Sequence, residues 1–192
     1  ARLAANSALA NQAKGANPTT TRIVAKVDAA RWFEDVSGLA AINRNSFSDE
    51  LPHARDWLLQ RLADAGLQTA THSYTLNSSS CGTTLPDRAL DNPWGFKRGG
   101  RLADEWIVIG GHYDSRNSVR CDGVSNVQPG ANDNASGCAG VLELARVFRN
   151  VPTERSLLFI CFSGEEQGLV GSLRYVQDLI AEGRMAQIKH MV

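Results

Sequence analysis

Residues 106–111 read Trp-Ile-Val-Ile-Gly-Gly, a continuous apolar run that ends in two glycines. A short apolar run bounded by turn residues is typical of a strand buried in the middle of a sheet. A second run of this kind covers Ser156 to Phe162. After each run, apolar residues recur at intervals of three and four, the spacing of amphipathic helices. Strand and helix therefore alternate from residue 104 onward, which predicts an α/β sandwich with a mostly parallel sheet.

The first half of the chain carries two further helical patterns and a strand pattern. Asp28 is a plausible N-cap for a helix whose apolar residues extend to Ala40. A second helix follows Pro52 and has Gly66 as its stop signal. Residues 67–76 alternate loosely and are rich in threonine, which predicts a strand. Further strands are expected within 88–99 and from 188 onward, and a further helix is expected over 169–180.

The composition excludes several classes of function. A hydrophobic share of 43% and a charged share of 21% in 192 residues are typical of one globular domain. Twenty basic and twenty acidic side chains cancel, so no overall field points to nucleic acid or to a membrane surface as a partner. The longest apolar runs are too short to cross a bilayer. Residues 1–24 show weak periodicity, so we expect them to be loosely structured and 25–192 to form a single domain.

Four cysteines occur, at positions 81, 121, 138 and 161. Cys81 and Cys121 lie in polar loop segments, and a disulfide between them would imply an oxidising compartment. Cys138 and Cys161 lie inside apolar patterns, so we expect them to be buried, unreactive thiols. A cysteine-rich zinc site is not expected, because the chain contains no CxxC pair. The first residues do not resemble a secretory signal, yet the loop cysteines favour a secreted or otherwise extracytoplasmic protein.

Three short polar motifs interrupt the apolar pattern. They read GGHYDS at 110–115, PGANDNASG at 129–137 and EEQG at 165–168. The first and third follow the two apolar strand patterns directly, and the second lies just before a predicted helix. Because ligands gather at the carboxyl ends of strands in such sheets, we expect the three motifs to form one site.

The residue types in these motifs are those of a metal-assisted hydrolase. Neutral imidazole is the commonest metal ligand, so His112 is a candidate ligand and Asp114 could orient it. The carboxylate of Asp133 has two oxygens and could span two cations. Of Glu165 and Glu166, one could bind metal while its neighbour takes a proton from water. The spacing does not say which glutamate has which role.

Each motif also has a simpler interpretation. A single histidine is commonly a surface or core residue, and Asp114 could be a turn residue. Asp133, like Asn134 or Ser136, could cap the helix that follows. The two glutamates could form a solvated turn. The occurrence of all three motifs at strand ends or before a helix is what favours chemistry.

The three motifs together closely resemble those of the M28 family of zinc aminopeptidases, with the third read as FSGEEQGLVGS at 162–172. The resemblance extends from Val27 to the end and is most specific over 104–192. It implies a three-layer α/β/α sandwich with a mixed, mostly parallel central sheet, and cleavage of peptides that have a free N-terminus. It also implies two zinc ions, with His112 and Glu166 as ligands of one ion each and Asp133 as the bridge between them. Glu165 would be the general base that activates a metal-bridging water, and Asp114 would be the partner of His112. Family members hold a cis peptide after the bridging aspartate, here Asp133-Asn134.

The family's pattern needs two further ligands, an Asp shortly after the strand that starts near Ile188 and a His much later. This sequence ends at Val192. We therefore expect 25–192 to be the N-terminal part of a zinc-peptidase catalytic domain, and the isolated chain to have little or no activity.

Other functions remain open at this point. A carboxypeptidase of the same fold, a single-zinc glutaminyl cyclase and a non-catalytic receptor or binding domain would share the architecture. A binding domain would have no need of both Glu165 and Glu166, so their presence favours an enzyme.

Overall fold

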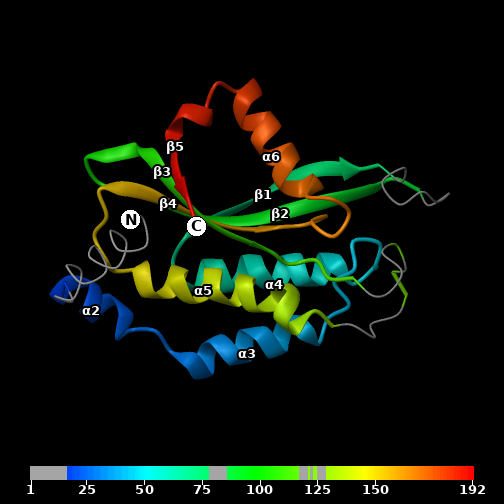
Figure 1. Cartoon of the computed structure of the whole chain (residues 1–192), viewed down its shortest axis with the longest axis horizontal. Helices are drawn as coiled ribbons and strands as arrows, with labels where there is room; N and C mark the ends of the chain where they lie inside the picture. Colours follow the sequence, from blue (N-terminus) through cyan, green and yellow to red (C-terminus); the bar gives the residue numbers. More distant parts are fainter. Residues whose placement is uncertain (1–16, 78–85, 117–120, 122, 125–128) are drawn as a thin grey trace, which may run out of the picture.

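The computed structural model describes residues 17–77, 86–116, 121, 123–124 and 129–192. Five strands form one sheet in the order β1-β2-β4-β3-β5 (Figure 1). Strand β3 pairs in parallel with both β4 and β5, whereas β2 pairs antiparallel with β1 and β4. The predicted mixed sheet is confirmed, with two parallel and two antiparallel pairings. The strand bounds are β1 Gln68–Leu76, β2 Arg88–Lys97, β3 Leu102–His112, β4 Arg155–Phe162 and β5 Ile188–Met191.

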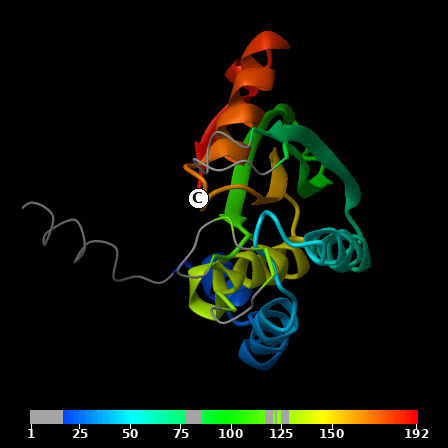
Figure 2. The ribbon, with the colours of Figure 1, turned by 90° about the vertical axis from the view of Figure 1, so that its right-hand side faces the viewer.

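Helices cover both faces of this sheet and give the three layers that were predicted. Helices α3, α4 and α5 lie on one face and α6 lies on the other (Figures 1 and 2). Among the described residues, no helix has both the length and the apolar character that a membrane span requires. The helix bounds are α2 Pro18–Val24, α3 Ala29–Ala40, α4 Leu51–Asp64, α5 Ser136–Phe148 and α6 Val170–Ala181, with short helical turns η2 Ala131–Ala135 and η3 Met185–Gln187.

Strand β4 lies at the centre of the core and explains why its sequence is continuously apolar. Seven of its eight residues are buried. Successive side chains of a strand point to opposite faces. Accordingly, Leu157 and Phe159 pack in the larger core cluster with α3, α4 and α5, whereas Leu158 and Ile160 belong to a smaller cluster beside Tyr175 of α6. A strand covered on both faces needs no polar side, so its pattern is a run and not an alternation.

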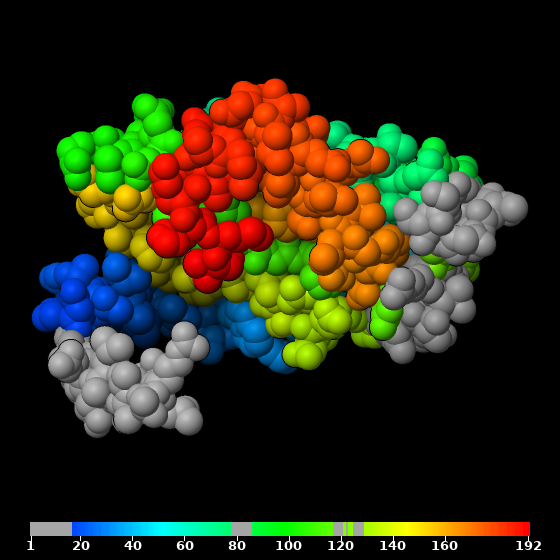
Figure 3. Space-filling view, turned by 45° about the horizontal axis from the view of Figure 1, so that its top comes forward, coloured from blue at the N-terminus to red at the C-terminus, as the bar shows by residue number. Residues whose placement is uncertain are grey.

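Strand β5 and helix α6 share the outer face of the molecule. Figure 3 shows them side by side, with α6 in orange and the C-terminal residues in red. The helix expected over 169–180 is α6, which ends at Ala181, and Gly183 after it has φ +68°. A residue without Cβ adopts this left-handed conformation without strain.

One helix starts at its predicted signal, and another forms where none was predicted. The Asp28 side chain accepts hydrogen bonds from the backbone N–H groups of Ala30 and Arg31 and caps α3. The segment 1–24 was predicted to be loosely structured, but Pro18–Val24 forms α2. Asn17 accepts a hydrogen bond from Thr19 N–H at 2.9 Å, and Pro18 favours a first helical turn. No residue of α2 is buried, and residues 1–16 lie outside the described part.

The prediction for Cys138 and Cys161 is wrong in one respect. Both are completely buried as expected, but they form a disulfide and are not thiols. Cys138 faces the sheet from α5 and Cys161 points toward that helix from β4, which places their Cα atoms 5.9 Å apart. A separation of this size permits a disulfide. The predicted Cys81–Cys121 pair stays a prediction because Cys81 lies outside the described residues.

Candidate active site

The three polar motifs meet at the carboxyl ends of β3 and β4. These strands are parallel neighbours, and His112 is level with Phe162 at their ends. Glu165 and Glu166 follow β4 after a turn at Gly164, where φ is +65°. Asp133 lies in η2, directly before α5, and α5 packs against both strands (Figure 1). Tertiary structure therefore brings together the five residues that the sequence singled out.

His112 lies between carboxylates on both sides of its ring. Its Nδ1 is 3.1 Å from the carbonyl oxygen and 3.4 Å from the carboxylate of Asp114. Its Nε2 is 3.0 Å from Asp133 Oδ1 and 3.8 Å from Glu165 Oε2. Burial by itself lowers the pKa of His112, but the hydrogen bond to Asp114 and the negative charges of all three carboxylates outweigh it and raise the pKa to about 9.

Asp114 connects the first motif to the third. Its side chain is completely buried. Oδ1 accepts a hydrogen bond from Glu165 N–H and Oδ2 accepts one from Glu166 N–H, each at 3.2 Å. Ser46 also donates its hydroxyl to Oδ2, at 3.2 Å. One carboxylate thus orients the imidazole and fixes the backbone of the glutamate pair, so Asp114 is not a simple turn residue.

Asp133 does not cap helix α5. Its side chain is 75% exposed and points to His112. Asn134 takes the capping role, because its Oδ1 accepts a hydrogen bond from Gly137 N–H at 2.9 Å. The peptide bond between Asp133 and Asn134 is cis, as the resemblance implied. The carboxylate of Asp133 is therefore available to a ligand.

The two glutamates have different surroundings. Glu165 is 34% exposed and lies on the His112 side. The side chain of Glu166 is only 8% exposed, and its Oε2 lies 3.3 Å from Arg116 Nε. Burial raises the pKa of Glu166, the negative charges of Asp114, Asp133 and Glu165 add to this, and Arg116 opposes it.

Sequence reasoning missed two arginines at the site. Arg116 follows the first motif directly and faces Glu166. Arg44 is completely buried and donates to the carbonyl oxygens of Tyr113 and Gly130, next to the first and second motifs. The sequence carried no local signal for Arg44, because five of the six residues of 43–48 are polar and a polar run after a helix is typical of an exposed loop. In the structure all six residues are buried.

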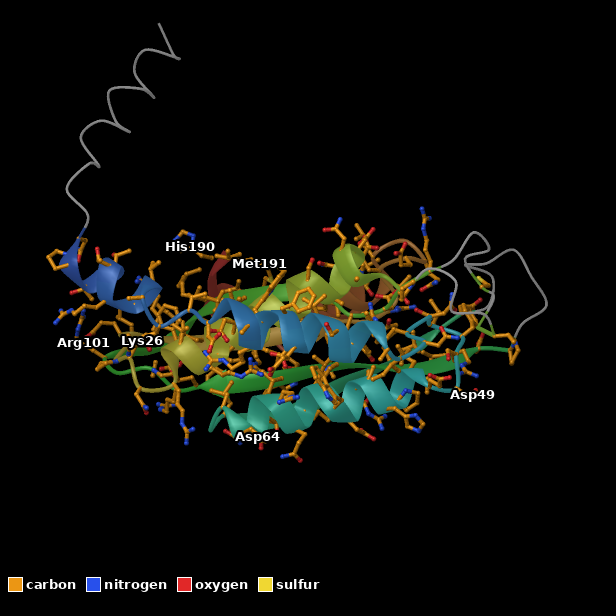
Figure 4. The ribbon with its side chains drawn as sticks, turned by 90° about the horizontal axis from the view of Figure 1, so that it is seen from below. Lys26, Asp49, Asp64, Arg101, His190 and Met191 are labelled. Carbon is orange, nitrogen blue, oxygen red and sulfur yellow. A yellow bond between two sulfur atoms is a disulfide. The ribbon has the colours of Figure 1, made fainter. Side chains whose placement is uncertain are left out.

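The remaining histidines do not join the site. His53 is exposed on α4, and His190 is exposed on β5, where Figure 4 labels it. His72 on β1 is 2.8 Å from Asp178 of α6. A cavity of about 330 Å³ opens beside His72, between α6 and the sheet, and none of the five site residues lines it.

The donor atoms of the site fit zinc, although the geometry within the described residues is not that of a closed metal site. Over those residues, no three His, Cys, Asp or Glu side chains are grouped to hold one ion. Four carboxylates and one imidazole nevertheless converge, and the contact of Arg116 with Glu166 leaves an excess of negative charge. Imidazole nitrogen and carboxylate oxygen are both zinc ligands. A proton and a metal ion would compete for His112 Nε2, because Nδ1 faces Asp114.

Comparison with known proteins relates the chain to one family of peptidases. The model of a family described as "Peptidase family M28" matches residues 96–192. A probable zinc metalloprotease of Pyrenophora tritici-repentis is 45% identical over 80 residues, which are 42% of this chain and 18% of that protein. Aminopeptidase YwaD of Bacillus subtilis is 42% identical over 73 residues, which are 38% of this chain and 14% of that protein. The chain spans less than a fifth of the length of these relatives.

Solved structures support the fold. An aminopeptidase from Aneurinibacillus sp. strain AM-1 has a TM-score of 0.70 and 17% identity, and the match covers 88% of this chain and 70% of that one. A glutaminyl cyclase from Fimbriiglobus ruber also has a TM-score of 0.70, with 18% identity over 85% of this chain and 59% of that one. Since proteins of two different names share this architecture, the fold alone does not select the chemistry.

Proposed function

The chain belongs to peptidase family M28, and from this premise we propose that the protein is a zinc-dependent aminopeptidase that removes N-terminal residues from peptides. The observation that carries the proposal is the position of His112 Nε2, which lies 3.0 Å from Asp133 and 3.8 Å from Glu165. An imidazole, a candidate metal-bridging carboxylate and a candidate base thus meet at the carboxyl ends of two parallel strands, where α/β proteins place their ligands.

We propose that His112, Asp133 and Glu166 hold two zinc ions. His112 would bind one ion through Nε2 and Glu166 would bind the other, with Asp133 shared between them. Zinc, when bound, polarises a peptide carbonyl and lowers the pKa of water. Burial raises the pKa of Glu166 and the nearby carboxylates add to this, while the carboxylates around His112 raise its pKa against the effect of burial. A bound cation would offset this surplus of negative charge.

Glu165 has the position of the general base. Its carboxylate faces His112 and is partly open to solvent, so it can take a proton from water and pass it to the leaving amine. Its backbone N–H is held by Asp114 at 3.2 Å. Asp114 positions both this backbone and the His112 ring, and it is itself completely buried. The base and the candidate ligand are therefore fixed by one carboxylate.

The relatives' names favour an aminopeptidase over a carboxypeptidase or a receptor domain. Both YwaD and the Aneurinibacillus protein are named aminopeptidases. The buried disulfide between Cys138 and Cys161 supports the further proposal that the protein works in an oxidising, extracytoplasmic compartment.

We propose low activity for the 192-residue chain by itself. The two ions would share Asp133, and each would have one further ligand among the proposed residues, His112 for one ion and Glu166 for the other. Catalytic zinc sites normally have three protein ligands, so binding to these residues alone should be weak.

The test uses the protein at its natural full length and an aminoacyl-p-nitroanilide substrate. We expect turnover that a chelator abolishes and zinc restores, and no cleavage of a peptide whose N-terminus is acetylated. Glu165→Gln should lower kcat by roughly 10²–10⁴-fold, the usual contribution of a general base, while zinc content is retained. The matched control is Glu105→Gln, which removes a partly buried glutamate that lies outside the site and pairs with Arg155 at 2.7 Å. Normal turnover of Glu165→Gln would exclude Glu165 as the base.

A further inference from the structure

Arg44 lies completely buried in the segment between α3 and α4. Its guanidinium group donates to carbonyl oxygens of three separate segments. Nε donates to Tyr113 at 2.6 Å, Nη2 donates to Gly130 at 2.9 Å, and Nη1 donates to Leu39 at the end of α3. Tyr113 follows His112 directly, and Gly130 lies three residues before Asp133. A single side chain thus connects the loop of His112 to the loop of Asp133.

The backbone of Arg44 strengthens this connection. Its carbonyl oxygen accepts a hydrogen bond from Ser115 N–H at 3.0 Å. The adjacent Asn45 forms a parallel bridge with Ser115. The segment therefore holds the first motif through its main chain while the guanidinium reaches the second motif. This arrangement leaves little freedom between Arg44 and the turn after β3.

The contact with Gly130 has little free space. Gly130 has φ +60°, and its carbonyl oxygen also accepts the N–H of Ala135 at 3.0 Å. A Cβ on Gly130 would lie 2.5 Å from the carbonyl oxygen of Asp133 and 3.0 Å from Arg44 Nη2. The loop can lie against the guanidinium only because this residue has no side chain.

We propose that Arg44 is a positioning residue that sets the spacing between His112 and Asp133. A guanidinium group has donors in a fixed planar fork, so it can reach three carbonyl groups in different directions at once. A lysine ammonium group is a single point of charge on a flexible stem and cannot replace all three contacts. The expected effect of Arg44 on metal binding rests on the proposed function, whereas the connection that Arg44 makes between the two loops does not.

Hydrogen exchange of the metal-free chain tests the connection directly. In Arg44→Lys, the carbonyl groups of Tyr113 and Gly130 lose charge-assisted hydrogen bonds, so the two loops should open more often. Exchange at the Ser115 and Ala135 amides in these loops should then rise roughly tenfold or more. Amides of the β1–β2 pairing should keep their wild-type rates. The matched control is Arg101→Lys, because Arg101 is exposed and pairs with Glu154. An equal rise at all core amides, or no rise at Ala135 and Ser115, would overturn the proposal.

A second variant approaches the same contact from the other side. Gly130→Ala should displace the loop from Nη2 while leaving the bonds to Tyr113 and Leu39 in place. We expect faster exchange at Ala135, and in the double variant a combined effect smaller than the product of the two single effects. Independent, multiplicative effects would show that Arg44 does not act through Gly130. If Arg44→Lys does not fold, unchanged exchange at Ala135 in Gly130→Ala is the result that rejects the proposal.

Zinc binding at natural full length separates the two proposals. We expect Arg44→Lys to bind zinc at least about tenfold more weakly than the wild type and Arg101→Lys to bind normally. Absence of zinc binding by the wild type would reject the proposed function, and the exchange result would still decide the role of Arg44. Wild-type zinc affinity in Arg44→Lys would reject its role in placing the ligands.

Discussion

Oδ2 of Asp114 accepts a hydrogen bond from the backbone N–H of Glu166 at 3.2 Å. The two residues are 52 positions apart and belong to the loops after β3 and β4. The same carboxylate also lies 3.4 Å from His112 Nδ1. A change at Asp114 should therefore disturb both motifs together, not the histidine alone.

Asp114→Asn is the first variant to make. The amide keeps one acceptor oxygen, so one of the two N–H groups of Glu165 and Glu166 would lose its partner. We expect roughly 10–100-fold weaker zinc binding at natural full length, the usual effect of losing a residue that orients a metal ligand. Isothermal titration measures this directly. Asp104→Asn, at an exposed position of strand β3, is the control, and equal affinities for the two variants would contradict the expectation.

Two glycines in helices should respond to alanine with opposite signs. Gly140 in α5 has open space around the position of a Cβ, so Gly140→Ala should raise the free energy of unfolding by about 0.5–1 kcal/mol. At Gly171 in α6 a Cβ would overlap the carbonyl oxygen of Ser163, so the same change should lower stability by about 1–3 kcal/mol. Urea unfolding measures both, and the same sign for both would refute the packing argument.

Glu143 should make the free energy of unfolding depend on pH in the acid range. Burial raises its pKa, but hydrogen bonds from Arg31 and from the backbone N–H of Asp28, with Arg146 nearby, outweigh burial and lower it below 4.5. A carboxyl with a lowered folded pKa contributes stability above its unfolded pKa, and this is lost as the pH falls through the folded pKa. Glu143→Gln should cost roughly 2 kcal/mol at pH 7 and progressively less below pH 4.5.

Unfolding curves at several pH values test this expectation. Glu154→Gln at an exposed pair with Arg101 is the control and should change little at any pH. A cost for Glu143→Gln that stays constant into strong acid would show that ionisation of Glu143 contributes nothing.

The Cys138–Cys161 disulfide should resist labelling. When the chain is unfolded without reductant, an alkylating reagent should leave both cysteines unmodified, and peptide mapping should recover them as one linked pair. The bond closes a segment with a sequence separation of 23, so its removal in a Cys138→Ala and Cys161→Ala double variant should cost about 3 kcal/mol. Full labelling of both residues without reductant would show that they are thiols.

The order of helices and strands could be predicted from the sequence because it depends on local periodicity. The burial of β4 on both faces leaves a continuous apolar run. Asp28 marks a helix start through its capping side chain, and Gly66 marks a helix end through its positive φ. Helix α2 was missed because it has no buried face, so its sequence carries no amphipathic period. The antiparallel pairing of β2 with β4 depends on contacts between distant segments and has no local signal.

By itself, the sequence determined which residues are candidates for the proposed site, since His112, Asp133 and the glutamate pair lie in polar motifs at strand ends or before a helix. Only the tertiary structure decided that Asp133 turns toward His112 while Asn134 caps α5. It also decided that Asp114 joins two motifs, and that Arg44 joins two loops. The reason is physical: a side chain's type is local, whereas its hydrogen-bond partners are set by segments that approach only when the chain is folded.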